Sequence, residues 1–120
     1  MANQIVWCDI PVLDLERAVR FYSAVLGSEV KKEQLPGGTI GVLPHNNGEV
    51  GACLVNSTGD KPSDHGVMIY LNANGRLDDA IGAVVSHGGK VLKPKHAIGP
   101  HGSRAVILDT EGNRVALHSD

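Results

Sequence analysis

The chain has 120 residues, 42% of them hydrophobic and 20% charged, which is the composition of an ordinary globular domain. Its 11 basic and 13 acidic residues give a formal net charge of −2 and form no long basic run. This argues against a nucleic-acid or membrane-surface partner. We expect a cytoplasmic protein, because the sequence contains neither a signal-peptide pattern nor a run of about 18 apolar residues. Cys8 and Cys53 lie in apolar runs and are expected to be buried free thiols.

The first half predicts one strand, one helix and three further strands. Apolar and β-branched residues predict a strand at 4–11. Apolar residues at helical spacing then predict a helix with Asp14 as N-cap and Gly27 as its end. Short runs bounded by Gly, Pro and Asn predict the remaining strands, at 28–33, 39–44 and 50–55.

The second half repeats this order. A strand is predicted at 65–73, followed by a helix from Leu77 to the stop at Gly88 and Gly89, with two aspartates in its first turn. Three further strands are predicted at 90–96, 103–109 and 113–118. Placing Val6–Ile10 on Val67–Leu71 requires an offset of 61 residues, and nearly the same offset places Gly27 on Gly89. A constant offset over several element boundaries indicates an internal duplication.

The predicted fold class is α+β, with two tandem βαβββ modules that form a curved mixed-sheet cup and carry their helices on the outside. We expect a single domain over 1–120. Module one covers about 4–56, the polar linker 57–64, and module two about 65–119. The open faces of the two sheets would then line a cavity suited to a small molecule.

Three stretches resemble the vicinal oxygen chelate superfamily, which includes glyoxalase I, the bleomycin-resistance proteins and the extradiol dioxygenases. They are IPVLDLERAVRFYSAVLG at 10–27, GGKV at 88–91 and DTEGNRV at 109–115. Within the superfamily the chain is most similar to small glyoxalase-related proteins of unassigned reaction. The resemblance implies paired modules around a cup, often in a homodimer, and in the enzymes a divalent metal.

The resemblance also implies where those enzymes hold the metal, with ligands on the first and last strands of each module. In this chain the matching positions are Trp7, Met68, Ala116 and one residue within 51–55. None of them offers an oxygen or imidazole donor, and Cys53 is the one thiol in the last segment. We therefore predict no cofactor and an absent metal site.

Strand alternation predicts which other side chains face the cup. Asp9 shares a face with Trp7, Tyr70 and Asn72 share one with Met68, and His118 shares one with Ala116. His101 lies in a glycine-bounded loop that can close over a cup in this fold. The predicted ligand-binding residues are Trp7, Asp9, Met68, Tyr70, Asn72, His101, Ala116 and His118.

Asp9 and His118 are candidate catalytic proton acceptors, and Tyr70 is a candidate orienting donor. Each has a plainer interpretation: Asp9 and His118 lie near strand ends where solvent can satisfy them, and Tyr70 can be cavity wall. Trp7 can fill the space of a metal or stack on a planar ligand. The remaining histidines are expected to be largely solvated; they are His45, His65, His87 and His96.

Three functions follow. The first is a bleomycin-resistance-like protein that binds a small molecule in the cup. The alternative is a lyase, isomerase or dioxygenase-like enzyme, without metal or with an unusual metal, acting on a small carbonyl or hydroxylated compound. The third is a non-catalytic dimeric module. The expected partners are a small-molecule ligand or substrate and a second copy of the chain, and the modules can pair within one chain or across the dimer.

Overall fold

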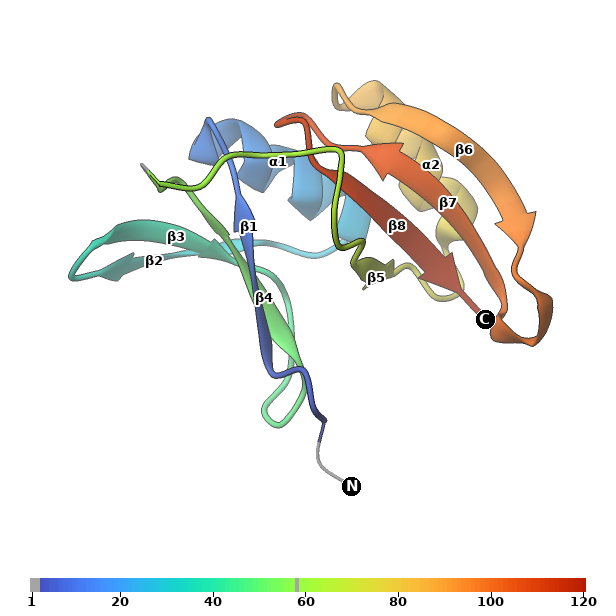
Figure 1. Ribbon diagram of the computed structural model, residues 1–120, viewed down its shortest axis with the longest axis horizontal. Coiled ribbons are helices and arrows are strands. Elements are labelled where there is room, and N and C mark those ends of the chain that lie inside the picture. Colours follow the sequence, from blue (N-terminus) through green and yellow to red (C-terminus); the bar gives the residue numbers. More distant parts are fainter. Residues whose placement is uncertain (1–2, 58) are drawn as a thin grey trace.

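The computed structural model describes residues 3–57 and 59–120 and contains two βαβββ modules (Figure 1). Module one consists of β1 (Trp7–Pro11), α1 (Leu15–Leu26), β2 (Lys31–Leu35), β3 (Gly38–Val42) and β4 (Gly51–Val55). Module two consists of β5 (Tyr70–Asn72), α2 (Leu77–Ser86), β6 (Lys90–Ala97), the short 3₁₀ helix η1 (Gly99–His101), β7 (Ser103–Leu108) and β8 (Arg114–Ser119).

Each module forms its own four-stranded mixed sheet with the same strand order. Module one has the order β1-β4-β3-β2 and module two the order β5-β8-β7-β6. In both, the first and last strands run parallel and the other pairs are antiparallel. Asp9 pairs with Cys53 and Tyr70 pairs with Ala116, so these two pairs occupy equivalent positions. The predicted α+β fold and tandem βαβββ modules are confirmed.

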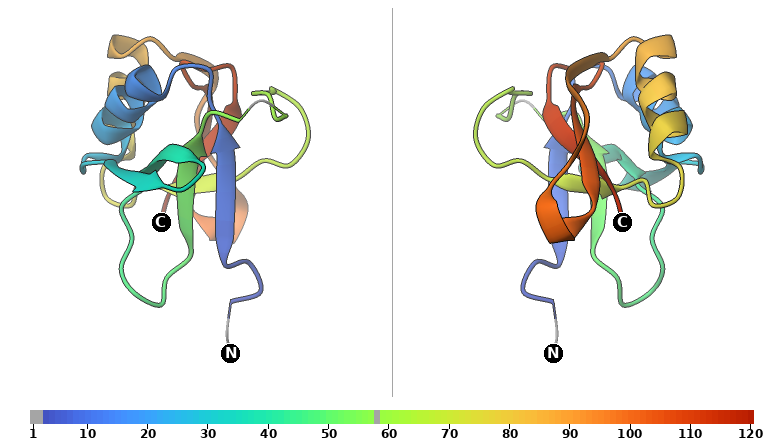
Figure 2. Two further views of the ribbon diagram at one scale, coloured as in Figure 1. Left: turned by 90° about the vertical axis from the view of Figure 1, so that its left-hand side faces the viewer. Right: turned by 90° about the vertical axis from the view of Figure 1, so that its right-hand side faces the viewer.

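Both helices lie on the same side of the sheets and pack against each other (Figure 2). Helix α1 begins as predicted, because the Asp14 carboxylate accepts a hydrogen bond from the Arg17 backbone N–H, and it ends at Gly27 with φ +68°. Its apolar stripe enters a core shared with α2 and both sheets, and the fully buried helix residues include Ala18, Tyr22, Val25, Ala80 and Val84. The opposite face of each sheet carries no helix (Figure 2).

The DTEGN turn between β7 and β8 joins the two modules. The Tyr22 hydroxyl of α1 donates to the buried Asp109 carboxylate, and Asn113 Nδ2 donates to the Pro11 carbonyl oxygen at 2.7 Å. Asp109 also accepts the backbone N–H groups of Glu111 and Asn113. These bonds satisfy polar groups that would be costly to bury unpaired, so this stretch of the resemblance has a structural role.

Several element boundaries differ from the predictions. The strand predicted at 28–33 lies at Lys31–Leu35, because the Ser28 and Val30 N–H groups bond back to Ser23 at the end of α1. The strand predicted at 65–73 spans only Tyr70–Asn72, and Val67 is 91% exposed. The first strand begins at Trp7 rather than at residue 4. The pattern of apolar residues therefore predicted these two strands to be longer than they are. The extra residues at their N-terminal ends pair with no other strand within the described residues.

Within the described residues, neither α1 with 12 residues nor α2 with 10 is long enough to cross a membrane, and no other helix qualifies.

Candidate functional site

The predicted strand faces agree with the observed burial. Ile10 and Val12 of the first strand region lie in the core, whereas Trp7 and Asp9 face the open side and are exposed. In β8, Val115 and Leu117 enter the core, as alternation requires if their neighbours face the open side. The open face thus carries polar side chains from both modules, in two groups.

The first group surrounds the Asp9 carboxylate in module one. Asp9 Oδ1 accepts hydrogen bonds from Trp7 Nε1 at 3.1 Å and from Cys53 Sγ at 3.3 Å. The edge of the Trp7 indole meets the His45 ring, with centroids 5.6 Å apart. The Gly51 backbone lies close to these rings: a Cβ at this position would come within 2.5 Å of the indole. Two hydrogen bonds therefore fix the Asp9 carboxylate, and the Gly51 backbone packs closely against the Trp7 indole.

Cys53 is a poor nucleophile and a poor metal ligand in this setting. Burial raises the pKa of its thiol to about 11, with a further contribution from the hydrogen bond to the Asp9 carboxylate. Burial also raises the pKa of Cys8. Both thiols are free, and both stay protonated near neutral pH, whereas metal binding and nucleophilic attack need a thiolate.

The positions at which the family's enzymes hold their metal carry poor donors here. Trp7 presents an indole N–H, Met68 a thioether, and Ala116 a methyl group with no exposed surface. The open-face residues of β4 offer only the protonated Cys53 thiol. Across residues 3–57 and 59–120, no group of three or more His, Cys, Asp and Glu side chains is placed to hold an ion. This donor set does not fit a divalent cation that prefers oxygen and imidazole ligands.

The second group surrounds Arg104 of β7 in module two. Its Nη1 donates to the Tyr70 hydroxyl, and its Nε donates to His96 Nε2 at 3.0 Å. The guanidinium carbon lies 5.8 Å from the centre of the Tyr70 ring. The His118 ring lies beside the same phenol, with centroids 6.3 Å apart. Strand register explains this gathering, since Arg104 pairs with His96 on one side and His118 on the other.

The loop at 98–102 contacts this group through its backbone. The His101 carbonyl oxygen lies 2.6 Å from His118 Nε2, which must therefore carry the hydrogen. The His101 ring is exposed. The contact of His101 with this group is thus made by its carbonyl group and not by its imidazole, and ligand contact by His101 stays a prediction.

An apolar cavity of about 670 Å³ lies between the modules. Module two supplies Met68, Tyr70 and Asn72 to its wall, and module one supplies the start of β4. The other lining residues are mainly apolar and include Ile5, Leu26, Leu43, Val50, Ala52, Val67 and Ile69. The volume falls within the range typical of small-molecule sites, and the apolar wall with few polar groups is typical of them too. Three of the predicted ligand-binding residues therefore line one cavity.

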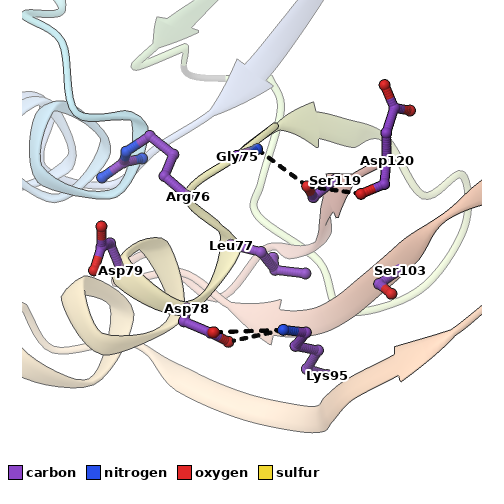
Figure 3. A pocket seen from close by; sticks show the side chains of 9 residues that line it. All are labelled: Gly75, Arg76, Leu77, Asp78, Asp79, Lys95, Ser103, Ser119 and Asp120. Atoms are coloured by element: carbon purple, nitrogen blue, oxygen red, sulfur yellow. Dashed lines mark hydrogen bonds and ion pairs between the residues drawn. The ribbon is translucent and has the colours of Figure 1, made fainter.

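A second cavity, of about 340 Å³, lies at the start of α2 (Figure 3). Several of its polar groups are already engaged: Lys95 Nζ lies 3.2 Å from Asp78 Oδ1, and the Ser119 hydroxyl accepts from the Gly75 N–H. Arg76 points away from it toward α1 (Figure 3) and donates to the Val25 carbonyl oxygen. Because Lys95 and Asp78 neutralise each other and Arg76 is engaged elsewhere, this cavity is a weaker candidate.

The sequence interpretation missed Arg104, and it expected His45 and His96 to be largely solvated. His45 is exposed as expected, although its ring meets Trp7, whereas the partly buried His96 accepts a hydrogen bond from Arg104. Alternation along 103–109 puts Arg104 on the open face, but its importance follows from strand register, which the sequence does not display. The contact between Trp7 and His45 depends on the close approach of both rings to the Gly51 backbone, which the sequence pattern also does not predict.

Comparisons with known proteins agree with this fold. A "Glyoxylase-like domain-containing protein" of Didymella fabae is 32% identical over 96% of this chain and 92% of its own length. "Putative glyoxylase CFP32" of Mycobacterium bovis is 29% identical over 92% of this chain, which spans only 43% of that protein. A solved member of the glyoxalase superfamily from Sphaerobacter thermophilus superposes with a TM-score of 0.72 at 22% identity, covering 100% of this chain and 99% of the other.

The family model described as Glyoxalase/Bleomycin resistance protein/Dioxygenase superfamily matches residues 4–117, nearly the whole chain. The duplicated modules, the buried DTEGN turn and this match agree, and the chain belongs to that superfamily.

Proposed function

We propose that this protein binds a small, mainly apolar molecule in the cavity between its modules and does so without the divalent metal of the superfamily's enzymes. The observation that carries the proposal is the 670 Å³ cavity with its apolar wall. The indole, thioether and methyl groups at the family's metal positions support the metal-free part.

The binding test uses Nile red, an uncharged fluorophore whose emission rises in apolar surroundings. Val50 lines the cavity and is 42% exposed, so Val50→Trp should fill part of the cavity without disturbing the core. Val85 is 64% exposed on α2 and lies outside this cavity, which makes Val85→Trp the matched control. We expect Val50→Trp to weaken binding at least tenfold and Val85→Trp to leave it unchanged. Equal binding by both variants would contradict the proposal.

The metal-free part has a separate test. Protein purified without chelator should contain far less than one equivalent of Mn, Fe, Ni or Zn by elemental analysis. A stoichiometric metal would contradict this part and restore the family's metal chemistry.

A metal-free enzyme is the alternative function. Its candidate groups face the open side, but Asp9 already accepts two hydrogen bonds and His118 Nε2 is engaged by the His101 carbonyl oxygen. Asp9 Oδ2 and His118 Nδ1, for which no hydrogen bond is found within the described residues, could still accept a proton there. Neither Asp9 nor His118, however, is among the residues that line the apolar cavity, and this favours binding over turnover.

We also infer that the protein forms a homodimer. Ile5 and Val6 before β1 and Val67 before β5 are at least 69% exposed, and Ile5 and Val67 border the cavity. A second copy would remove this apolar surface from water. Light scattering coupled to size-exclusion chromatography should give twice the chain mass of 12.6 kDa.

A further inference from the structure

Arg104 is a partly buried cation with no carboxylate partner among residues 3–57 and 59–120. Its side chain makes no ion pair within the part of the chain that the structure describes, and both groups that accept from it are neutral. His96 is neutral because its Nδ1 donates to the Pro94 carbonyl oxygen at 2.8 Å while its Nε2 accepts from Arg104. Two hydrogen bonds therefore fix the Arg104 guanidinium in place, but no carboxylate among the described residues neutralises its charge.

Several hydrogen-bond donors of this group have no acceptor among the described residues. A guanidinium has five N–H donors, and the recorded bonds use only those of Nε and Nη1. The Tyr70 hydroxyl accepts from Arg104, so its own hydrogen can be donated. A planar carboxylate matches such a set, because its two oxygens accept parallel bonds from a guanidinium.

The strand that pairs with β7 also carries positive charge. The neighbouring strand β6 carries Lys90, Lys93 and Lys95 and no acidic residue. Lys95 pairs with Asp78 of α2, but no such pair involves the other two within the described residues. An anion at Arg104 would therefore meet a favourable potential, with no nearby carboxylate on this strand to oppose it.

Tyr70 connects the cation to the cavity, since this residue lines the cavity and its hydroxyl accepts from Arg104. We propose that the ligand is an apolar molecule bearing a carboxylate, with its body in the cavity and its carboxylate on Arg104 and Tyr70. This inference rests on the proposed function and adds the chemical class of the ligand. Arg104 acts as the residue that selects the charged group.

The test compares 1-naphthoate with 1-naphthamide, which share a ring system and differ in charge, by isothermal titration calorimetry. The wild type should bind the naphthoate at least tenfold more tightly, which corresponds to about 1.4 kcal/mol. Arg104→Met keeps the apolar stem, so it should abolish this preference and leave naphthamide binding within twofold. Arg104→Lys keeps the charge and should retain part of the preference. Arg20→Met removes one charge from an exposed position on α1 and should change neither affinity.

The outcomes separate the two proposals. Equal affinity of the wild type for both probes would overturn the carboxylate inference and leave the cavity proposal intact. Failure of both probes to bind would overturn both. A preference that survives Arg104→Met in a variant with wild-type circular dichroism would also contradict the role of Arg104, whatever the behaviour of Arg104→Lys.

Discussion

The Glu111 carboxylate in module two receives two hydrogen bonds from the Arg17 guanidinium in module one, although 94 residues separate them in the chain. Nε donates to Oε2 at 2.7 Å and Nη2 donates to Oε1 at 2.9 Å. Oε1 also accepts the backbone N–H groups of Leu13 and Asp14, both at 2.8 Å. The Glu111 side chain has no exposed surface, so this carboxylate is a buried junction between the modules.

The first prediction concerns stability in acid. Burial alone would raise the pKa of Glu111, but bonds from Arg17, Asp14, Thr110 and Leu13 outweigh it and lower the pKa from 4.5 to about 2. The ionised form thus stabilises the fold by about 3 kcal/mol, fully above pH 4.5 and progressively less as pH falls towards 2. Urea unfolding should show this loss in the wild type and not in Glu111→Gln, which should be less stable at pH 7. Glu16→Gln, in an exposed pair with Lys32, should cost less than about 0.5 kcal/mol.

The second prediction concerns the end of α1. Gly27 has φ +68°, and a Cβ there would lie 2.8 Å from the Arg76 guanidinium carbon. Gly27→Ala should lower the free energy of unfolding by about 1–2 kcal/mol through backbone strain and displacement of Arg76. Arg76→Ala in the same chain should recover only the steric part. Gly37→Ala is the control, because its Cβ would meet nothing within 4 Å. Equal costs for Gly27→Ala and Gly37→Ala would refute the argument.

The third prediction concerns Trp7, the single tryptophan of the chain. A Cβ at Gly51 would lie 2.5 Å from the indole and 3.0 Å from the His45 ring, so Gly51→Ala must move one or both rings. Moving the indole away from Asp9 and His45 should shift its emission maximum and change its quenching by acrylamide. Gly82→Ala, in open space on α2, should leave the spectrum unchanged. An unaltered spectrum in Gly51→Ala would show that the indole does not depend on this contact.

The fourth prediction concerns Cys53. Because burial first, and then Asp9, raises its thiol pKa to about 11, alkylation by iodoacetamide at pH 8 should be much slower than that of an unfolded cysteine. Asp9→Asn should accelerate it only modestly, since burial remains. Mass spectrometry after timed quenching gives the rate, and protein in urea gives the reference. Rapid modification in the native state would contradict the assigned environment.

The sequence predicted the fold well because its signals are local and repeated. Asp14 and Gly27 mark the ends of α1, and the 61-residue offset marks the two modules. The shortfalls occurred where no local signal exists. Strand β5 is only Tyr70–Asn72 because pairing with β8 covers no more of the apolar run, and β2 is displaced by the capping bonds to Ser23.

The site was less predictable because it depends on register between strands. Alternation correctly placed Trp7, Asp9, Tyr70 and His118 on the open side, and Arg104 follows the same rule. That Arg104 meets Tyr70, however, requires knowing that β7 and β5 flank β8 on opposite sides. Ala116 is a further example. Alternation places it on the open face of β8, but the neighbouring strands bury it completely, so it cannot contact a ligand there as predicted.

The equivalence of Asp9 with Tyr70 and of Cys53 with Ala116 has a stoichiometric consequence. A duplicated fold that kept matching side chains would offer two equal half-sites for the same compound. Here one half presents a carboxylate held by an indole and a thiol, and the other presents a phenol held by a guanidinium. The two halves have diverged in charge while keeping their backbone register. A titration should therefore saturate at one molecule per chain, bound in a single orientation.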